Sequence, residues 1–295
     1  MTIDMKAIHD SDRTLVMGVL NITEDSFSDG GLWLDPANAK AHGEAMMKDG
    51  ADIIDIGAES TRPGVKRVSE EDEQTEQTRV LGAVDALIPE GAVLSIDTTR
   101  ASVARMALEH GAQIINDVSG GRLDREVPHV VAGHSESLYI VQHWRGWLAG
   151  STGDVPDADT SVYANGVVDD VYDELMKQVD DVLQAGVSPS QIIIDPGLGF
   201  SKPSVEHNFP LMTALERFNA TGYPVLIGAS RKRFVGAALA DAGIDKPNMD
   251  SKDNATAAIS ALCAEHGAWA VRVHDVEKSR DAVAIGNAWR AFAND

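Results

Sequence analysis

The chain has 295 residues and a formal net charge of −21, from 46 acidic and 25 basic side chains. Such an acidic surface repels nucleic acid and anionic membranes, so we expect neither as a partner. Cys263 is the only cysteine, which excludes an intrachain disulfide, and the sequence shows no cleavage signal and no apolar run of membrane-spanning length, so we expect a cytoplasmic protein.

Short apolar runs that end in a polar residue recur along the chain and predict strands buried on both faces. The first, at 15–22, leads into a loop rich in turn-forming residues and then a helix at 36–49, stopped by Gly50. The cycle then repeats, with strands predicted at 52–57, 93–98, 114–119, 138–143, 192–197, 225–230 and 271–275. Further helices are predicted at about 69–87, 101–110, 167–185 and 278–292.

Eight strands that alternate with helices predict a (β/α)8 TIM barrel, an α/β fold. An open doubly wound sheet shows the same alternation and is the alternative, but the chain has no Gly-x-Gly-x-x-Gly turn. No linker or composition shift divides the sequence. We therefore expect one domain over 1–295, with its core at about 15–292.

Polar residues stand at or just past the C-terminal end of every predicted strand, which in a TIM barrel is the catalytic face. One such residue alone often begins a turn or caps a helix. Eight at eight strand ends predict a site instead. They are Asn21, Glu59, Asp97, Asn116, His143, Asp195, Ser230 and His274.

Cations gather at the last two strand ends. Arg272 and His274 alternate with valines, so they share one face of their strand, which we expect to be the barrel interior. The strand at 225–230 leads into a helix whose first turn is basic, and a helix N-terminus already attracts anions. In so acidic a chain, these cations predict an anionic substrate. The cationic group comprises Arg62, Lys202, Lys232, Arg233, Arg272 and His274.

Acids and an amide form the complementary group, namely Asp97, Asn116 and Asp195. Carboxylates accept paired N–H bonds and amides both donate and accept, so together they suit a flat heterocycle with amino and lactam groups. Two acids could also bind a metal, but the spacing of a dedicated metal cage is absent. Residues alone thus predict an enzyme that binds a polar heteroaromatic ring beside an anion, without specifying the reaction.

Six blocks of the sequence resemble the dihydropteroate synthases, a family of pterin-binding enzymes. They lie at 17–31, 57–64, 115–121, 195–202, 228–234 and 272–276, in family order. The resemblance implies a transferase of folate biosynthesis, of the kind that sulfonamides target. It would condense 7,8-dihydropterin-6-ylmethyl diphosphate with 4-aminobenzoate to give 7,8-dihydropteroate and diphosphate. It further implies a homodimer formed through helices late in the barrel.

Carried over by position, the resemblance implies three groups of binding residues and one metal ion. The pterin would be bound by Asp97, Asn116, Asp195 and Lys232. The diphosphate would be bound by Asn21, Arg62, Arg272 and His274, with Mg²⁺ held at Asn21. The aminobenzoate site would be formed by Phe27, Thr61, Arg62, Pro63, Phe200 and Arg233.

The chain departs from the family pattern at three places that carry no assigned role: Glu24, Ala58 and Gln142. Arg231 has no assigned ligand, and we expect it to pair with a neighbouring acid. Two rival functions share the pterin site. One is a methyltransferase barrel that passes a folate methyl group to a corrinoid, which has no use for diphosphate-binding residues. The other is a non-catalytic pterin-binding paralogue.

Overall fold

A computed structural model describes residues 4–22, 35–58, 70–146, 161–244 and 247–293. Its strands form one parallel sheet in the order β6-β5-β4-β3-β2-β1-β8-β7. Ile194 on β6 pairs in parallel with Val225, just before β7, and this bridge joins the two edges into a barrel. The strands are β1 Leu15–Asn21, β2 Ile53–Gly57, β3 Leu94–Asp97, β4 Ile114–Asp117, β5 Leu138–Gln142, β6 Ile192–Asp195, β7 Leu226–Ile227 and β8 Ala270–Val273.

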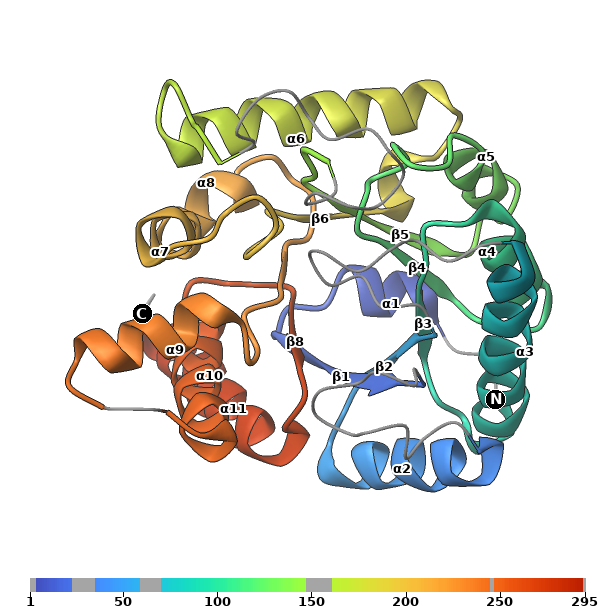
Figure 1. The fold of residues 1–295 in the computed structure, drawn as a ribbon, viewed down its shortest axis with the longest axis horizontal. Coiled ribbons are helices and arrows are strands. Elements are labelled where there is room, and N and C mark those ends of the chain that lie inside the picture. Colours follow the sequence, from blue (N-terminus) through green and yellow to red (C-terminus); the bar gives the residue numbers. More distant parts are fainter. Residues whose placement is uncertain (1–3, 23–34, 59–69, 147–160, 245–246, 294–295) are drawn as a thin grey trace.

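The predicted TIM barrel is confirmed and the open sheet is wrong, because the bridge from Ile194 to Val225 leaves no free edge in this order of strands. Helices surround the strands (Figure 1). Four of the short helices, α1, α5, α7 and α8, were not predicted. The helices are α1 Met5–His9, α2 Pro36–Asp49, α3 Glu70–Leu87, α4 Ala101–Glu109, α5 Glu126–Ala132, α6 Val167–Gln184, α7 Val205–Thr213, α8 Leu215–Asn219, α9 Arg233–Asp241, α10 Met249–Glu265 and α11 Val276–Ala293.

Side-chain alternation divides the barrel into two apolar clusters. The outward residues of the strands pack under the helices, while Met17, Ile53, Ile140 and Ile193 form a second cluster inside the barrel. Helix α1 lies against the N-terminal strand ends, where the Trp269 indole N–H donates to the carbonyl of Ile8 at 2.8 Å. The interior is therefore packed with apolar side chains near the N-terminal ends of the strands, and it becomes polar only toward their C-terminal ends.

Strand register brings the polar strand ends together. Asn21 pairs with Gly57, Gly57 with Asp97, and Asp97 with Asn116, so four neighbouring strands end level with one another. Across the barrel, Asp195 is level with Gln142 on β5. This register, rather than proximity in sequence, assembles the predicted site.

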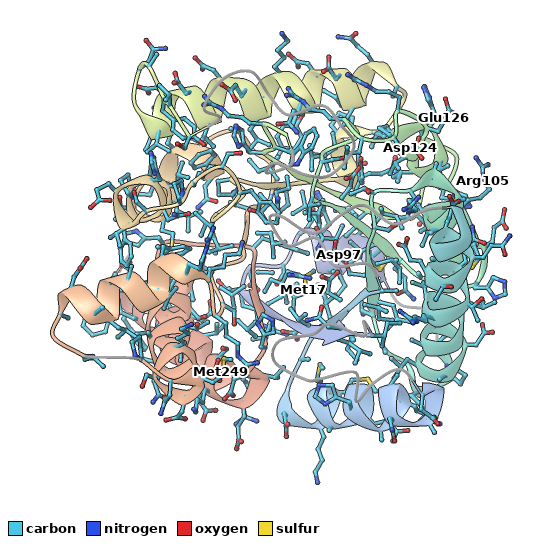
Figure 2. All side chains as sticks on the ribbon, in the orientation of Figure 1. Met17, Asp97, Arg105, Asp124, Glu126 and Met249 are labelled. Carbon is cyan, nitrogen blue, oxygen red and sulfur yellow. The ribbon has the colours of Figure 1, made fainter. Side chains whose placement is uncertain are left out.

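Loop carboxylates secure the ends of the helices near this face. Asp124, which follows β4, accepts the Ala101 N–H at the start of α4 at 2.8 Å and the Glu126 N–H at 3.0 Å. In Figure 2, Asp97 lies in the centre of the barrel, whereas Asp124, Glu126 and Arg105 lie out at α4 and α5. Among the described residues, no helix is long and apolar enough to cross a membrane.

Methionine truncation provides a test of the packed interior. Met17 is fully buried inside the barrel and Met249 is 42% exposed at the start of α10 (Figure 2). We expect Met17→Ala to lower the free energy of unfolding by about 2–5 kcal/mol, because it opens a cavity. Met249→Ala should change it by less than about 0.5 kcal/mol. Urea denaturation followed by circular dichroism measures both, and equal losses would contradict a packed interior.

Candidate active site

The Arg272 guanidinium lies at the centre of the polar end of the barrel. Its Nε donates to Asp55 Oδ2 at 2.6 Å and its Nη2 donates to Asp97 Oδ2 at 2.9 Å. Both carboxylates are almost fully buried, and only 21% of the arginine side chain is exposed. The prediction that Arg272 faces the barrel interior is confirmed.

Asp55 was missed by the sequence analysis. It stands in the middle of β2, away from the strand end where the polar residue was predicted to lie. Its Oδ2 also accepts the Nδ2 amide of Asn116 at 3.1 Å, so one carboxylate oxygen ties β2 to both β4 and β8. The available signal was a carboxylate within an apolar strand, two residues before Gly57, on the inward face.

Buried acceptors near Arg272 are left without partners among the described residues. Asp55 Oδ1, Asp97 Oδ1 and Asn116 Oδ1 have no hydrogen bond. Buried acceptors are seldom left unsatisfied, and N–H donors on a ligand are one means of satisfying them. These acceptors fit a ring that carries amino and lactam N–H groups, the kind of ring predicted for Asp97 and Asn116.

Opposing charges compete for the proton of Asp97. Burial raises the pKa of Asp97 to about 7, the positive charge of Arg272 opposes this shift, and the like charge of Asp55 adds to it. Arg272 therefore keeps Asp97 close to the balance between acid and carboxylate near neutral pH. A ligand N–H donor at this carboxylate favours the charged form.

Asp195 and Lys232 form the opposite wall of the site. Asp195 Oδ1 accepts the Gly197 N–H at 2.7 Å. A Cβ added at Gly228 would lie 3.7 Å from Lys232 Nζ and 3.9 Å from Asp195 Oδ2, so the ammonium and the carboxylate both approach this glycine. Burial lowers the pKa of Lys232 to about 8, and the Asp195 charge opposes that shift.

The loop after β6 contacts Lys232 directly. Lys232 Nζ donates to the carbonyl of Leu198 and lies 5.0 Å from the centroid of the Phe200 ring. A Cβ at Gly199 would lie 3.1 Å from Lys232 Cδ, which leaves little room for any other residue there. The structure thus brings the predicted pterin-site lysine beside Phe200, a predicted aminobenzoate-site residue.

His274 and Asn21 lie at the rim of the same end. The Ser230 hydroxyl accepts the His274 backbone N–H at 3.2 Å, and its Oγ lies 2.9 Å from His274 Nδ1. A Cβ at Gly57 would lie 3.5 Å from Asn21 Oδ1 and 3.8 Å from Asp97 Oδ2. Asn21 therefore stands next to the carboxylate group, with its amide oxygen toward Gly57.

One of the predicted cations, Lys202, lies away from the mouth of the barrel. Lys202 is 1% exposed and donates to loop carbonyls and to His143 rather than lining the mouth with the other cations. Arg231 pairs with Asp253 on α10 through two bonds of 2.7 and 2.9 Å, which confirms the expected ion pair. Arg233 is exposed at the first residue of α9.

Two of the three departures from the family pattern are described. Gln142 donates to the carbonyl of Val118 at 3.2 Å, so it binds the loop after β4, and Ala58 is buried. Several predicted residues lie outside the described part of the chain: Glu24, Phe27, Glu59, Thr61, Arg62 and Pro63.

Comparison with known proteins identifies the family. A family model described as pterin binding enzyme matches residues 17–274. A dihydropteroate synthase of Mycobacterium leprae is 48% identical over 275 residues, covering 93% of each chain. The chain belongs to the dihydropteroate synthase family.

Solved structures of this family share the whole fold. A Yersinia pestis dihydropteroate synthase in a sulfonamide complex is 31% identical with a TM-score of 0.83, covering 96% of each chain. A Xanthomonas albilineans dihydropteroate synthase with 4-aminobenzoic acid is 34% identical with a TM-score of 0.81, covering 95% of this chain and 94% of that one. The methyltransferase and the non-catalytic paralogue are not favoured.

The effect of neighbouring charges on the pKa of Asp97 can be tested by titration of this member of the dihydropteroate synthase family. Asp55→Asn removes a like charge, so the pKa of Asp97 should fall below the value of about 7. Arg272→Gln removes the opposing cation and should raise it. Ser95→Ala alters a buried hydroxyl on the same strand as Asp97, one that has no hydrogen bond among the described residues, and should leave the pKa of Asp97 unchanged.

Carbon-13 NMR of labelled aspartate measures this titration. Protonation of Asp97 near neutral pH would separate its carboxyl signal from that of an aspartate with the ordinary pKa of about 4. Shifts of the same sign in Asp55→Asn and Arg272→Gln would contradict the arrangement.

Proposed function

We propose that this protein is a dihydropteroate synthase that joins 7,8-dihydropterin-6-ylmethyl diphosphate to 4-aminobenzoate, releasing diphosphate. The observation that carries this proposal is the convergence of Asp97, Asn116, Asp195 and Lys232 around Arg272. Its relatives at high identity and coverage carry this name. The reaction is one in folate biosynthesis.

The ring would lie between the two walls of the site. Asp97 on β3 and Asn116 on β4 would form hydrogen bonds with one edge of the ring. Asp195 and Lys232 would form hydrogen bonds with the other edge. Carboxylates suit the amino and N–H groups of a pterin, while the ammonium suits its carbonyl oxygen. The guanidinium of Arg272, already fixed by two carboxylates, would meet the ring without further ordering.

The chemistry requires no nucleophilic side chain. As diphosphate leaves, positive charge develops on the pterin methylene and spreads into the ring. Carboxylates beside the ring stabilise that charge, while cations at the rim stabilise the departing anion. The amine of 4-aminobenzoate then attacks the methylene carbon and loses a proton, so the C–O bond to diphosphate is replaced by a C–N bond.

The diphosphate would lie at the rim, near Asn21, Arg272 and His274, with Arg62 as a further ligand outside the described residues. We propose Mg²⁺ as the metal, with Asn21 as its protein ligand. Mg²⁺ prefers oxygen donors and often takes only one or two from the protein and the rest from phosphate and water. The amide oxygen of Asn21 fits this mode, and no cluster of three acidic, histidine or cysteine ligands exists among the described residues.

When bound, Mg²⁺ supplies positive charge that neutralises the leaving diphosphate. This chain's residues would orient that group: Ser230 holds the His274 ring, and Arg272 is held by Asp55 and Asp97. Titration calorimetry with Mg²⁺ and inorganic diphosphate tests the assignment, because Asn21→Ala should weaken binding of the pair. Unaltered binding would reject Asn21 as the ligand.

4-Aminobenzoate would lie over Phe200 with its carboxylate toward Arg233 and the N-terminus of α9. Phe27, Thr61, Arg62 and Pro63 would complete that site. A Xanthomonas relative is described with 4-aminobenzoic acid and a Yersinia relative with a sulfonamide. We therefore also propose that sulfonamides compete with 4-aminobenzoate here. A sulfonamide that lowers turnover without raising the KM for 4-aminobenzoate would contradict this.

A direct assay tests the function and two of its residues. Purified protein with pterin diphosphate, Mg²⁺ and labelled 4-aminobenzoate should yield labelled dihydropteroate. We expect Lys232→Ala and Arg272→Ala each to lower kcat/KM by about 100-fold or more, because each removes a charged contact to the ring or its leaving group. Absence of product from wild type would reject the synthase.

Matched substitutions of exposed cations provide the control. Lys177 on α6 and Arg105 on α4 are both exposed on helices outside the barrel (Figure 2 shows Arg105). Their alanine variants should keep wild-type turnover, and circular dichroism should show all four variants folded. Unchanged turnover in Lys232→Ala or Arg272→Ala would reject that residue's assignment.

We further propose a homodimer formed through α10 and α11. The support for the dimer is an exposed apolar face on these helices. Leu262 is 63% exposed, Ile285 67%, Trp289 68% and Phe292 82%. Large apolar side chains gathered at the surface are typical of protein interfaces.

We also propose a cytoplasmic location, in line with the acidic, cysteine-poor composition. Recovery of the protein with membranes after cell fractionation would contradict this location.

Charge introduced into this apolar face should separate the copies. We expect wild type to have the mass of a dimer and Trp289→Asp that of a monomer, because a buried unpaired carboxylate is costly at an interface. Val162→Asp alters a similarly exposed apolar residue, 64% exposed, before α6 and should leave the dimer intact. Size-exclusion chromatography with light scattering measures the mass, and a monomeric wild type would reject the dimer.

A further inference from the structure

Three charged or titratable groups contact one another behind the β6 loop and play no part in the chemistry above. They are Lys202 on that loop, His143 at the end of β5 and Glu174 on α6. Lys202 is 1% exposed and His143 is fully buried. Burying such groups is costly unless they are hydrogen-bonded. Their arrangement therefore requires a physical reason.

Lys202 uses all three of its ammonium donors on neutral acceptors. Its Nζ donates to the carbonyls of Gly197 and Phe200, each at 3.0 Å, and to His143 Nδ1 at 2.9 Å. Its side chain thus runs back under its own loop and holds both ends of the segment 197–200. Its carbonyl is in turn held by Asn208, whose Oδ1 accepts the Gly199 N–H at 2.7 Å.

His143 can make both of its hydrogen bonds, to Lys202 and to Glu174, in only one tautomer. The Glu174 carboxylate can only accept, so His143 Nε2–H must donate to it, and Nδ1 of the neutral ring is the acceptor for Lys202. Nε2 faces Glu174 Oε2 at 3.0 Å, and that carboxylate also receives Arg145 Nε at 2.8 Å and Nη2 at 2.7 Å. The neutral imidazole therefore links the buried Lys202 side chain to the Glu174 carboxylate, which Arg145 holds in place. Burial and the Lys202 charge lower the pKa of His143 to about 3, in agreement with a neutral ring.

The loop that Lys202 holds is the one that positions Lys232. Three carbonyls of the loop are divided between the two lysines: those of Gly197 and Phe200 accept from Lys202, and that of Leu198 accepts from Lys232. A loop whose carbonyls point in different directions over so few residues requires unusual backbone angles. Gly197 has φ +69° and Gly199 φ +79°, and Ser201 is a non-glycine residue at φ +53°.

We propose that Glu174, His143 and Lys202 form a chain of positioning residues that fixes the β6 loop and thereby places the Lys232 ammonium and the Phe200 ring for substrate binding. This role rests on the proposed function, since it concerns how tightly the pterin site is pre-formed. Lys202 is in this view a support for the site and not a diphosphate ligand.

Paired substitutions at His143 test the chain without removing the buried lysine. His143→Gln offers one amide oxygen to Lys202 and one N–H to Glu174, so it reproduces both hydrogen bonds. We expect its KM for pterin diphosphate to stay within about threefold of wild type. His143→Leu keeps the volume but neither bond, and we expect that KM to rise tenfold or more with kcat nearly unchanged, because ground-state binding alone is weakened.

Direct binding separates this proposal from the synthase activity. Affinity for 6-hydroxymethylpterin, measured by fluorescence, should fall tenfold or more in His143→Leu and in Lys202→Met, but not in His143→Gln. Lys177→Met, an exposed lysine on α6, should match wild type. If wild type binds the pterin but makes no dihydropteroate, the proposed function fails while the positioning role stands.

Two results would overturn the positioning role. One is pterin affinity equal to wild type in folded His143→Leu, with thermal stability alone reduced, which would leave a purely structural network. The other is a loss in His143→Gln as large as in His143→Leu, which would require the imidazole itself. A wild type that binds no pterin would overturn the positioning role and the proposed function together.

Discussion

Arg272 imposes the main constraint on this barrel, because a guanidinium inside a closed sheet must be neutralised where it stands. Asp55 and Asp97 supply that neutralisation from β2 and β3, and Asp55 also receives the Asn116 amide from β4. One cation therefore links side chains from β2, β3 and β8. Because each carboxylate gives Arg272 one oxygen, the other oxygen of each is left without a partner among the described residues.

The opposite wall is organised by lysines instead of an arginine. In the β6 loop, Lys232 donates to the carbonyl of Leu198 and Lys202 donates to those of Gly197 and Phe200. Asp195 opposes the loss of charge that burial imposes on Lys232. The site thus has one wall fixed by bonds between strands and another fixed through a loop, and the loop wall requires the deeper support of His143 and Glu174.

Local pairing also explains how so acidic a chain presents cations at one face. Arg231 is matched by Asp253, Arg272 by Asp55 and Asp97, and Lys232 lies near Asp195. Each of these cations is held by an acid from a different element, so the fold sets their positions. The net charge of −21 consequently says little about the field within the site.

Sequence alone determined the strand and helix cycle, the TIM barrel and the inward face of Arg272, because hydrophobic alternation and strand-end polarity are local patterns. The family blocks supplied the reaction and most residue assignments. Only the tertiary structure revealed that Asp55 holds Arg272 and that Lys202 turns away from the mouth toward His143. Both depend on which strands and loops become neighbours, and a pairing across 217 residues, such as Asp55 with Arg272, leaves no local trace in the sequence.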